Sequence, residues 1–103
     1  MNKQIAEKLG WAEEADGWHA VGDFFEEGTI RRTAYPVTLP DFTHSMDACF
    51  KYIVPWWYEH GLYGIFFDYE EKEISVTTRE WSTRKPFELG KESEAVCKAF
   101  LEV

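Results

Sequence analysis

Hydrophobic and polar positions change their period along the chain, and each period predicts one kind of element. Between residues 43 and 60, apolar side chains recur every three or four positions, which is the spacing of one helix face. Between residues 62 and 79, they recur at every second position on both sides of a charged turn, which predicts a two-stranded hairpin. We expect the rest of the chain to be arranged around this helix and hairpin.

The predicted helix over residues 43–60 begins at Thr43, whose hydroxyl can accept hydrogen bonds from backbone N–H groups as an N-cap. Its apolar face follows the i, i+4, i+7 and i+11 spacing and consists of Met46, Phe50, Ile53 and Trp57. This face is expected to pack into the core.

Pro55 lies inside this helical pattern and conflicts with it. A proline in a helix interior removes one hydrogen bond and clashes with the preceding turn, at a cost of about 3 kcal/mol. The helix therefore either ends near Val54 or continues to His60 with a kink. We expect the kinked helix, because the tryptophans after the proline keep the helical spacing and Gly61 follows as a stop signal.

The hairpin over residues 62–79 has one strongly apolar face. In the first strand, one face by period two consists of Tyr63, Ile65, Phe67 and Tyr69. In the second strand, the side chains expected to point inward are Ile74, Val76 and Thr78. Phe66 lies on the opposite face, which we expect to be partly covered as well. A third strand is expected after Trp81.

Two shorter helices are predicted at the ends of the chain. The helix over residues 2–9 stops at Gly10 and docks through Ile5, Leu9 and Trp11. The helix over residues 91–102 carries an apolar stripe of Val96, Cys97, Phe100 and Leu101. Between the first helix and Pro40, we expect a short strand at 18–21 and an edge strand at 29–35, with Pro36 preventing regular structure beyond it.

These elements predict a single compact α+β domain, in which an antiparallel, hairpin-based sheet packs against helices. The length of 103 residues fits one domain with one core. The chain is 45% hydrophobic and 17% aromatic, so its composition favours a folded protein over a disordered one.

The net charge of −8 disfavours binding to nucleic-acid phosphates and to anionic membranes. Within residues 1–30, seven acidic residues against two lysines account for −5 of this charge. No apolar run has the length of a membrane span and no signal-peptide core is present, so we expect a cytosolic protein in the host cell.

Candidate chemistry is sparse. The chain contains no nucleophile-elbow, zinc-protease, Walker or dinucleotide-binding motif. Cys49 and Cys97 have no zinc spacing, and both are expected in helices as small buried hydrophobes. Pairs of carboxylates fall in expected loops, where solvation explains them. We therefore expect no catalytic residue, no metal, no cofactor and no enzymatic activity.

Two groups of residues are candidates for binding a ligand or partner. Trp56, Trp57 and Tyr58 cannot all face one core, because adjacent helical residues point about 100° apart. At least one of them is therefore expected at the rim. A wide buried stripe that covers both sheet and loop explains the run, and the functional alternative is an aromatic anchor for a partner.

The second group is the basic patch of Arg79, Trp81, Arg84 and Lys85, the one basic cluster of the sequence that includes an aromatic residue. Its charge and ring can hold a phosphate-bearing, nucleotide-like ligand. Neutralisation of nearby acidic residues is the competing explanation. The pair Arg31 and Arg32 is a weaker candidate of the same kind.

Three segments together resemble the phage ABA sandwich domain family of small phage and prophage proteins. They read IAEKLGW (Ile5 to Trp11), PDFTHSMDACF (Pro40 to Phe50) and EAVCKAFL (Glu94 to Leu101). The resemblance spans nearly the whole chain, but each motif is short. The chain departs from the family pattern at Pro55 and over residues 23–37.

The resemblance implies an α/β/α sandwich and a phage or prophage origin, but it implies no reaction, because the matching positions are core and capping residues. We expect a non-enzymatic accessory protein that binds a host or phage protein, and one form of this expectation is an acidic inhibitor that presents carboxylates to a nucleic-acid-handling or defence factor. The alternative is a module that binds or sequesters a nucleotide-like ligand. A homodimer is also consistent with the expected edge strand and the many aromatics.

Overall fold

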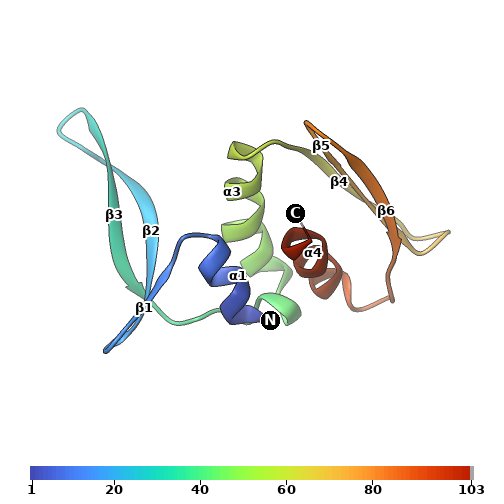
Figure 1. The fold of residues 1–103 in the computed structure, drawn as a ribbon, viewed down its shortest axis with the longest axis horizontal. Coiled ribbons are helices and arrows are strands. Elements are labelled where there is room, and N and C mark those ends of the chain that lie inside the picture. Colours follow the sequence, from blue (N-terminus) through green and yellow to red (C-terminus); the bar gives the residue numbers. More distant parts are fainter. Residues whose placement is uncertain (103) are drawn as a thin grey trace.

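The protein is a single α+β domain whose helices lie between two three-stranded antiparallel sheets (Figure 1). The computed structural model describes residues 1–102, without the side chains of residues 23–26 and 30–32. The α+β class and the antiparallel sheet predicted from the sequence are confirmed. The central position of the helices differs from the central sheet that the family resemblance implies.

The first sheet consists of β1 (Ala12–Glu14), β2 (Gly17–Glu26) and β3 (Thr29–Val37), in that order. Its β2–β3 hairpin projects away from the helices as an arm (Figure 1). The radius of gyration is therefore 15.0 Å, compared with about 13 Å for a globular chain of this length.

The expected edge strand is confirmed as β3, but the prediction that Pro36 ends regular structure is wrong. Pro36 lies inside β3, opposite His19 of β2. A proline is tolerated there because β3 is at the edge of its sheet, where a missing N–H on the outer side breaks no ladder hydrogen bond.

The N-terminal helix α1 (Asn2–Lys8) forms as expected and packs through its predicted residues. Ile5, Leu9 and Trp11 are all buried. Gly10 has a φ of 87°, a left-handed conformation that suits glycine and turns the chain away from the helix.

The central helical segment begins later than the sequence predicts. A 3-10 turn, η1 (Phe42–His44), precedes α2 (Met46–Ala48), and Thr43 lies inside that turn. The N-cap of α2 is Ser45, whose hydroxyl accepts a hydrogen bond from the backbone N–H of Ala48 at 3.1 Å. Thr43 is therefore not the N-cap, although it has the same chemistry.

The helical path continues past Pro55, and a π-helical turn accommodates the proline. This turn, η2 (Cys49–Ile53), leads into α3 (Val54–Glu59), and the N–H of Val54 donates to the carbonyl of Cys49, five residues earlier. A π turn is wider than an α turn, which relieves the clash of the proline ring with the preceding turn. The continuing helix is confirmed, but the π turn was not predicted.

The extra residue in the π turn changes which side chains face the core. Cys49, Ile53 and Trp57 are buried at successive intervals of four residues. Phe50, which the sequence pattern places on the apolar face, is 60% exposed. The predicted inward position of Phe50 is therefore wrong, whereas those of Ile53 and Trp57 are confirmed.

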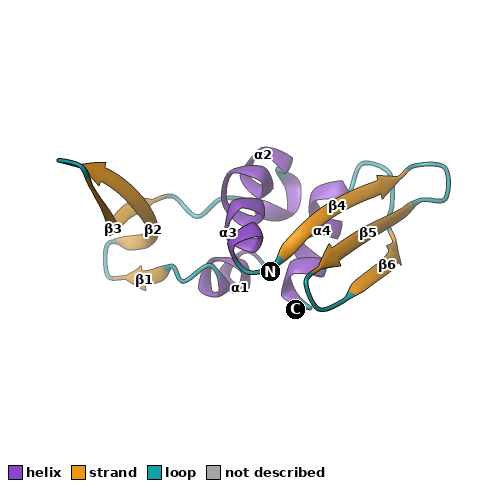
Figure 2. Ribbon diagram, turned by 90° about the horizontal axis from the view of Figure 1, so that it is seen from above, coloured by secondary structure: helices purple, strands orange, loops and turns teal. Residues whose placement is uncertain are grey.

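The second sheet consists of β4 (Leu62–Asp68), β5 (Glu73–Thr78) and β6 (Ser82–Pro86), in that order. The third strand expected after Trp81 is confirmed as β6. The final helix, α4 (Glu92–Leu101), lies on one face of this sheet (Figure 2). Ile74 and Val76 of β5 are buried on that face, as predicted.

The predicted inward face of β4 is only half correct. Ile65 and Phe67 are partly buried, whereas Tyr63 and Tyr69 are exposed. An irregularity in the register between Leu62 and Gly64 explains Tyr63, because it breaks the strict alternation at the start of the strand. Tyr69 lies beyond the end of β4, in the turn.

Candidate functional site

The aromatic run at the end of α3 is divided between the core and the surface. Trp57 is buried against Phe100, with ring centroids 5.4 Å apart. Trp56 is partly buried and stacks on His60, with centroids 3.7 Å apart and ring planes 11° apart. Tyr58 is exposed. This arrangement agrees with the expectation that at least one of the three residues lies at the rim.

Arg79, at the end of β5, lies against the glycine that follows α3. Its backbone N–H donates to the carbonyl of Gly61 at 2.8 Å, and a Cβ added to Gly61 would lie 3.4 Å from the Nη2 atom of Arg79. Among the residues that the structure describes, none forms an ion pair or side-chain hydrogen bond with the Arg79 guanidinium. Its charge is therefore open to a ligand.

A pocket of about 80 Å³ joins the end of α3 to the turn after β5. Its walls include His60, Arg79 and Trp81, together with one carboxylate, that of Glu80. Thr78 holds the turn in place, because its hydroxyl accepts from the N–H of Trp81 at 3.1 Å and donates to the carbonyl of Trp81 at 3.0 Å. A cation and an aromatic ring in one small pocket can bind an anionic group attached to a planar one.

The other members of the predicted basic patch lie elsewhere, so the four-residue patch does not form. The Nε of Arg84 donates to the hydroxyl of Ser75 at 3.2 Å, on the face of the sheet away from α4. Lys85 points to the opposite face of β6 and pairs with Glu102 at 2.5 Å. The sequence missed this separation because neighbouring residues of a strand alternate between its two faces. The side chains of Arg31 and Arg32 lie outside the described residues.

Exposed aromatic side chains gather around β4. We call this region the β4 surface and define it as Phe50, Tyr58, Tyr63, Phe66 and Tyr69, all exposed. The hydroxyl of Tyr58 donates to the carbonyl of Tyr63 at 3.5 Å, which connects α3 to the strand. Phe66 is 63% exposed on the face of the sheet that α4 does not cover. The expectation that this face of β4 is partly covered therefore does not hold at Phe66, although Gly64 and Asp68 on the same face are partly buried.

An apolar hollow of about 80 Å³ lies between β4 and the helical segment beside it. Its lining residues are apolar or sulfur-containing and come from the helices and from β4: Met46, Cys49, Phe50, Val54, Ile65, Phe67 and Val96. Phe50 stands at this hollow because the π turn rotates it out of the core. A neighbouring apolar side chain could therefore be received there without disturbing the core.

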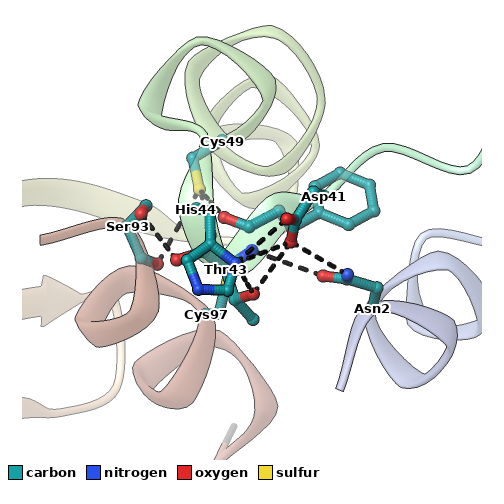
Figure 3. Close-up of polar contacts among 8 residues, drawn as sticks. Asn2, Asp41, Thr43, His44, Cys49, Ser93 and Cys97 are labelled. Atoms are coloured by element: carbon teal, nitrogen blue, oxygen red, sulfur yellow. Dashed lines mark hydrogen bonds and ion pairs between the residues drawn. The ribbon is translucent and has the colours of Figure 1, made fainter. Parts of the chain in front are cut away.

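A polar cluster around Asp41 connects the N-terminal helix to the 3-10 turn (Figure 3). The Asp41 carboxylate accepts hydrogen bonds from His44 Nδ1 at 3.0 Å, Asn2 Nδ2 at 3.1 Å and Thr43 Oγ1 at 2.9 Å. These bonds, that from His44 above all, lower the pKa of Asp41. The hydroxyl of Ser93 donates to the carbonyl of Thr43 at 2.7 Å and joins α4 to the same turn. The cluster is explained by its role in joining elements.

The two cysteines meet in the core behind this cluster (Figure 3). Their sulfur atoms are 4.0 Å apart, and the Cys49 thiol donates to the carbonyl of Phe42 at 3.2 Å. The hydrogen bond with Cys49, together with burial, raises the pKa of the Cys97 thiol. A protonated, buried thiol is a poor nucleophile. The prediction that both cysteines are buried is confirmed.

A wider groove of about 250 Å³ separates the arm from the helices. Trp11, Tyr35, Tyr52 and Trp56 contribute aromatic side chains to it. The Nζ of Lys51 lies 5.2 Å from the centroid of the Tyr52 ring, so the Tyr52 ring already forms a cation–π contact within the protein.

Comparisons of the chain with known proteins identify no relative. No protein-family model, no curated protein and no solved structure matches the chain. Across residues 1–102, no group of three or more His, Cys, Asp or Glu side chains is placed to hold a metal ion. None of the helices in the described part of the chain combines the length and apolarity needed to cross a membrane.

Proposed function

We propose that the chain is a non-enzymatic accessory protein of a phage or prophage that binds a host protein in the cytosol through its β4 surface. The phage origin rests on the sequence resemblance alone. The binding role rests on one observation, the gathering of exposed aromatic side chains around β4.

Aromatic exposure of this kind favours binding over simple solvation. Tyrosine and phenylalanine are enriched where proteins meet, because each buries a large area on association and loses little conformational freedom. The residues of the β4 surface come from η2, α3, β4 and the turn after β4, and all lie at or beside this one strand. Phe50 and Phe66 lie on opposite sides of the sheet. Phe66 in particular is 63% exposed, on the face of the sheet opposite Ile65 and Phe67.

The net charge of the chain indicates the charge of the partner's surface. At −8, the protein favours a partner with a basic surface, and attraction between the two weakens as salt screens it. A nucleic-acid-handling or defence factor fits, because its basic surface normally meets phosphates. We therefore expect an interaction that combines an aromatic contact with salt sensitivity.

The test is a comparison of captured host proteins between the wild type and two variants. Phe66→Gln removes an exposed ring from the β4 surface, and Leu89→Gln removes an exposed apolar side chain from the loop before α4. We expect a stoichiometric host partner to bind wild type and Leu89→Gln alike and to bind Phe66→Gln at least tenfold more weakly. Equal capture by all three proteins, or no partner from several hosts, contradicts the proposal.

The pocket at Arg79 supports a second candidate function, the binding of a nucleotide-like anion. The observation that favours it is an arginine without an ion pair among the described residues, beside a tryptophan in a defined pocket. This candidate keeps Arg79 and Trp81 from the predicted patch and excludes Arg84 and Lys85 from the site.

Thermal unfolding with nucleoside monophosphates, cyclic nucleotides and inorganic phosphate tests this candidate. A bound ligand at one hundred times its Kd stabilises a protein by about 2.7 kcal/mol. We expect Arg79→Gln to abolish that stabilisation and Arg84→Gln, which removes an equal charge on the outer face of β6, to retain it. No stabilisation at millimolar ligand, or equal loss in both variants, removes this candidate.

A further inference from the structure

The edge of β4 is open for pairing with another strand. β4 is the outermost strand of its sheet, so half of its backbone N–H and C=O groups point away from β5. Among the described residues, none beyond β5 forms a backbone hydrogen bond with residues 64–68. At the start of the strand, Tyr58 covers the carbonyl of Tyr63. The free edge is therefore a five-residue segment.

This edge lacks the residues by which proteins usually prevent strand addition. Proline, lysine and inward-pointing charges are common protections of exposed edges. Residues 62–67 contain none of them, and the first charge is Asp68 at the end of the strand. Residues 64–67, which follow the register irregularity between Leu62 and Gly64, therefore carry none of these protecting residues.

The apolar hollow lies where alternate side chains of an added strand would point. Residues of a new strand opposite Ile65 and Phe67 would share their face of the sheet. Ile65 and Phe67 line the hollow together with Phe50 and Val54. A residue opposite Phe66 would instead contact the exposed ring on the other face. Free backbone groups beside a side-chain pocket are the features of recognition by strand addition.

The turn after β4 adds a charge preference to this edge. Asp68 accepts from the N–H groups of Glu70 and Glu71 at 3.1 and 3.0 Å, which fixes the turn. Within the described part of the chain, the side chains of Glu70 and Glu71 form no ion pair. Carboxylates at this end of the edge favour a basic residue in the occupant.

We propose that β4 binds an extended peptide segment of the partner protein as a fourth strand of its sheet. This proposal rests on the proposed function above. The segment runs antiparallel to β4, like every other strand pair of this sheet. It carries aliphatic residues at two alternate positions facing the hollow, and a lysine or arginine near its N-terminal end, beside Glu70 and Glu71. The binding free energy comes from backbone hydrogen bonds, and the hollow gives selectivity.

Selection of displayed random heptapeptides on the intact protein tests this mode of binding. We expect enriched peptides to combine alternating aliphatic residues with a basic N-terminal half. We expect them to bind Phe50→Gln at least tenfold more weakly than wild type, because the variant places an amide at the hollow. The matched control Leu89→Gln should bind within twofold of wild type. Since Phe50 and Leu89 are both exposed, both variants should fold, which circular dichroism checks.

Three outcomes overturn strand addition: no enrichment, enrichment of peptides without this pattern, or equal affinity for Phe50→Gln and wild type. Light scattering measures whether the protein alone forms a dimer. A dimer that Phe50→Gln dissociates would assign the β4 edge to a second copy of this chain and overturn the proposed peptide partner. The proposed function fails separately. If a captured host protein no longer binds Phe66→Gln but still binds Phe50→Gln, the protein-binding role stands and the proposal of strand addition is wrong.

Discussion

Alanine substitutions at Phe50 and Ile53 distinguish the observed helix phase from the phase that the sequence pattern predicts. The pattern places both side chains on one buried face. In the structure, Ile53 is 0% exposed and Phe50 is 60% exposed, because a π turn occupies Cys49–Ile53. The two substitutions therefore have different expected costs.

The burial of each side chain sets the magnitude. Ile53→Ala opens a cavity in the core and is expected to lower the free energy of unfolding by about 2–5 kcal/mol. Phe50 keeps about two fifths of its side chain in contact, or about 80 Å² of an aromatic that buries about 200 Å² when enclosed. At about 25 cal/mol per Å², this is worth about 2 kcal/mol. The better helix propensity of alanine recovers about 0.5 kcal/mol of it.

Urea unfolding followed by tryptophan fluorescence measures both costs, and an unchanged m value shows that the comparison is sound. We expect Phe50→Ala to lose about 1.5 kcal/mol or less and Ile53→Ala to lose clearly more. A loss of about 3–5 kcal/mol for Phe50→Ala, as for a buried phenylalanine, and a smaller loss for Ile53→Ala would refute the π turn and the exposure of Phe50.

Three further substitutions test other parts of the structure. Gly61→Ala should cost about 1–2 kcal/mol in chemical unfolding, because Gly61 has a φ of 105° and a Cβ there meets Arg79; an unchanged midpoint contradicts this. The raised pKa of Cys97 means that the unfolded chain loses the thiol proton at a lower pH than the folded chain does. The free energy of unfolding should therefore fall above pH 9 by up to about 1.4 kcal/mol per pH unit, and Cys97→Ala should make this pH dependence flatter. The lowered pKa of Asp41 means that its contribution is present above its usual pKa and is lost as pH falls through the lowered value. Asp41→Asn should therefore reduce the acid-side loss of stability, and an unaltered acid limb counts against the role of its hydrogen bonds.

Local patterns predicted the elements well wherever one strong signal decided them. The apolar spacing and Gly10 gave the first helix, the alternation in β5 gave Ile74 and Val76 as buried, and the edge strand at 29–35 became β3. These features depend on residues close together in sequence, so a single chain contains the information.

The features that failed depend on contacts between distant parts of the chain or on small geometric choices. Thr43 and Ser45 are both suitable caps, and only the folded structure shows that Ser45 is used. The π turn adds one residue to a helical turn and thereby exposes Phe50. No local pattern distinguished that turn from an α-helix with a kink at Pro55.

The candidate sites were predicted in part for the same reason. The sequence identified Arg79 and Trp81 but grouped them with residues on other faces of β6. It did not identify His60 as their neighbour, because His60 reaches the pocket through the packing of α3 against β4. The signal that could have found the β4 surface is the concentration of aromatics in a strand that has no charge before Asp68.

Amide hydrogen exchange of the protein with and without its captured host partner tests the central claim most directly. The account predicts that the partner slows exchange within residues 58–69, while β6 (Ser82–Pro86), the opposite edge of the same sheet, exchanges as before. Protection confined to the β2–β3 arm, to residues 79–81 or to β6, with β4 unchanged, would contradict it.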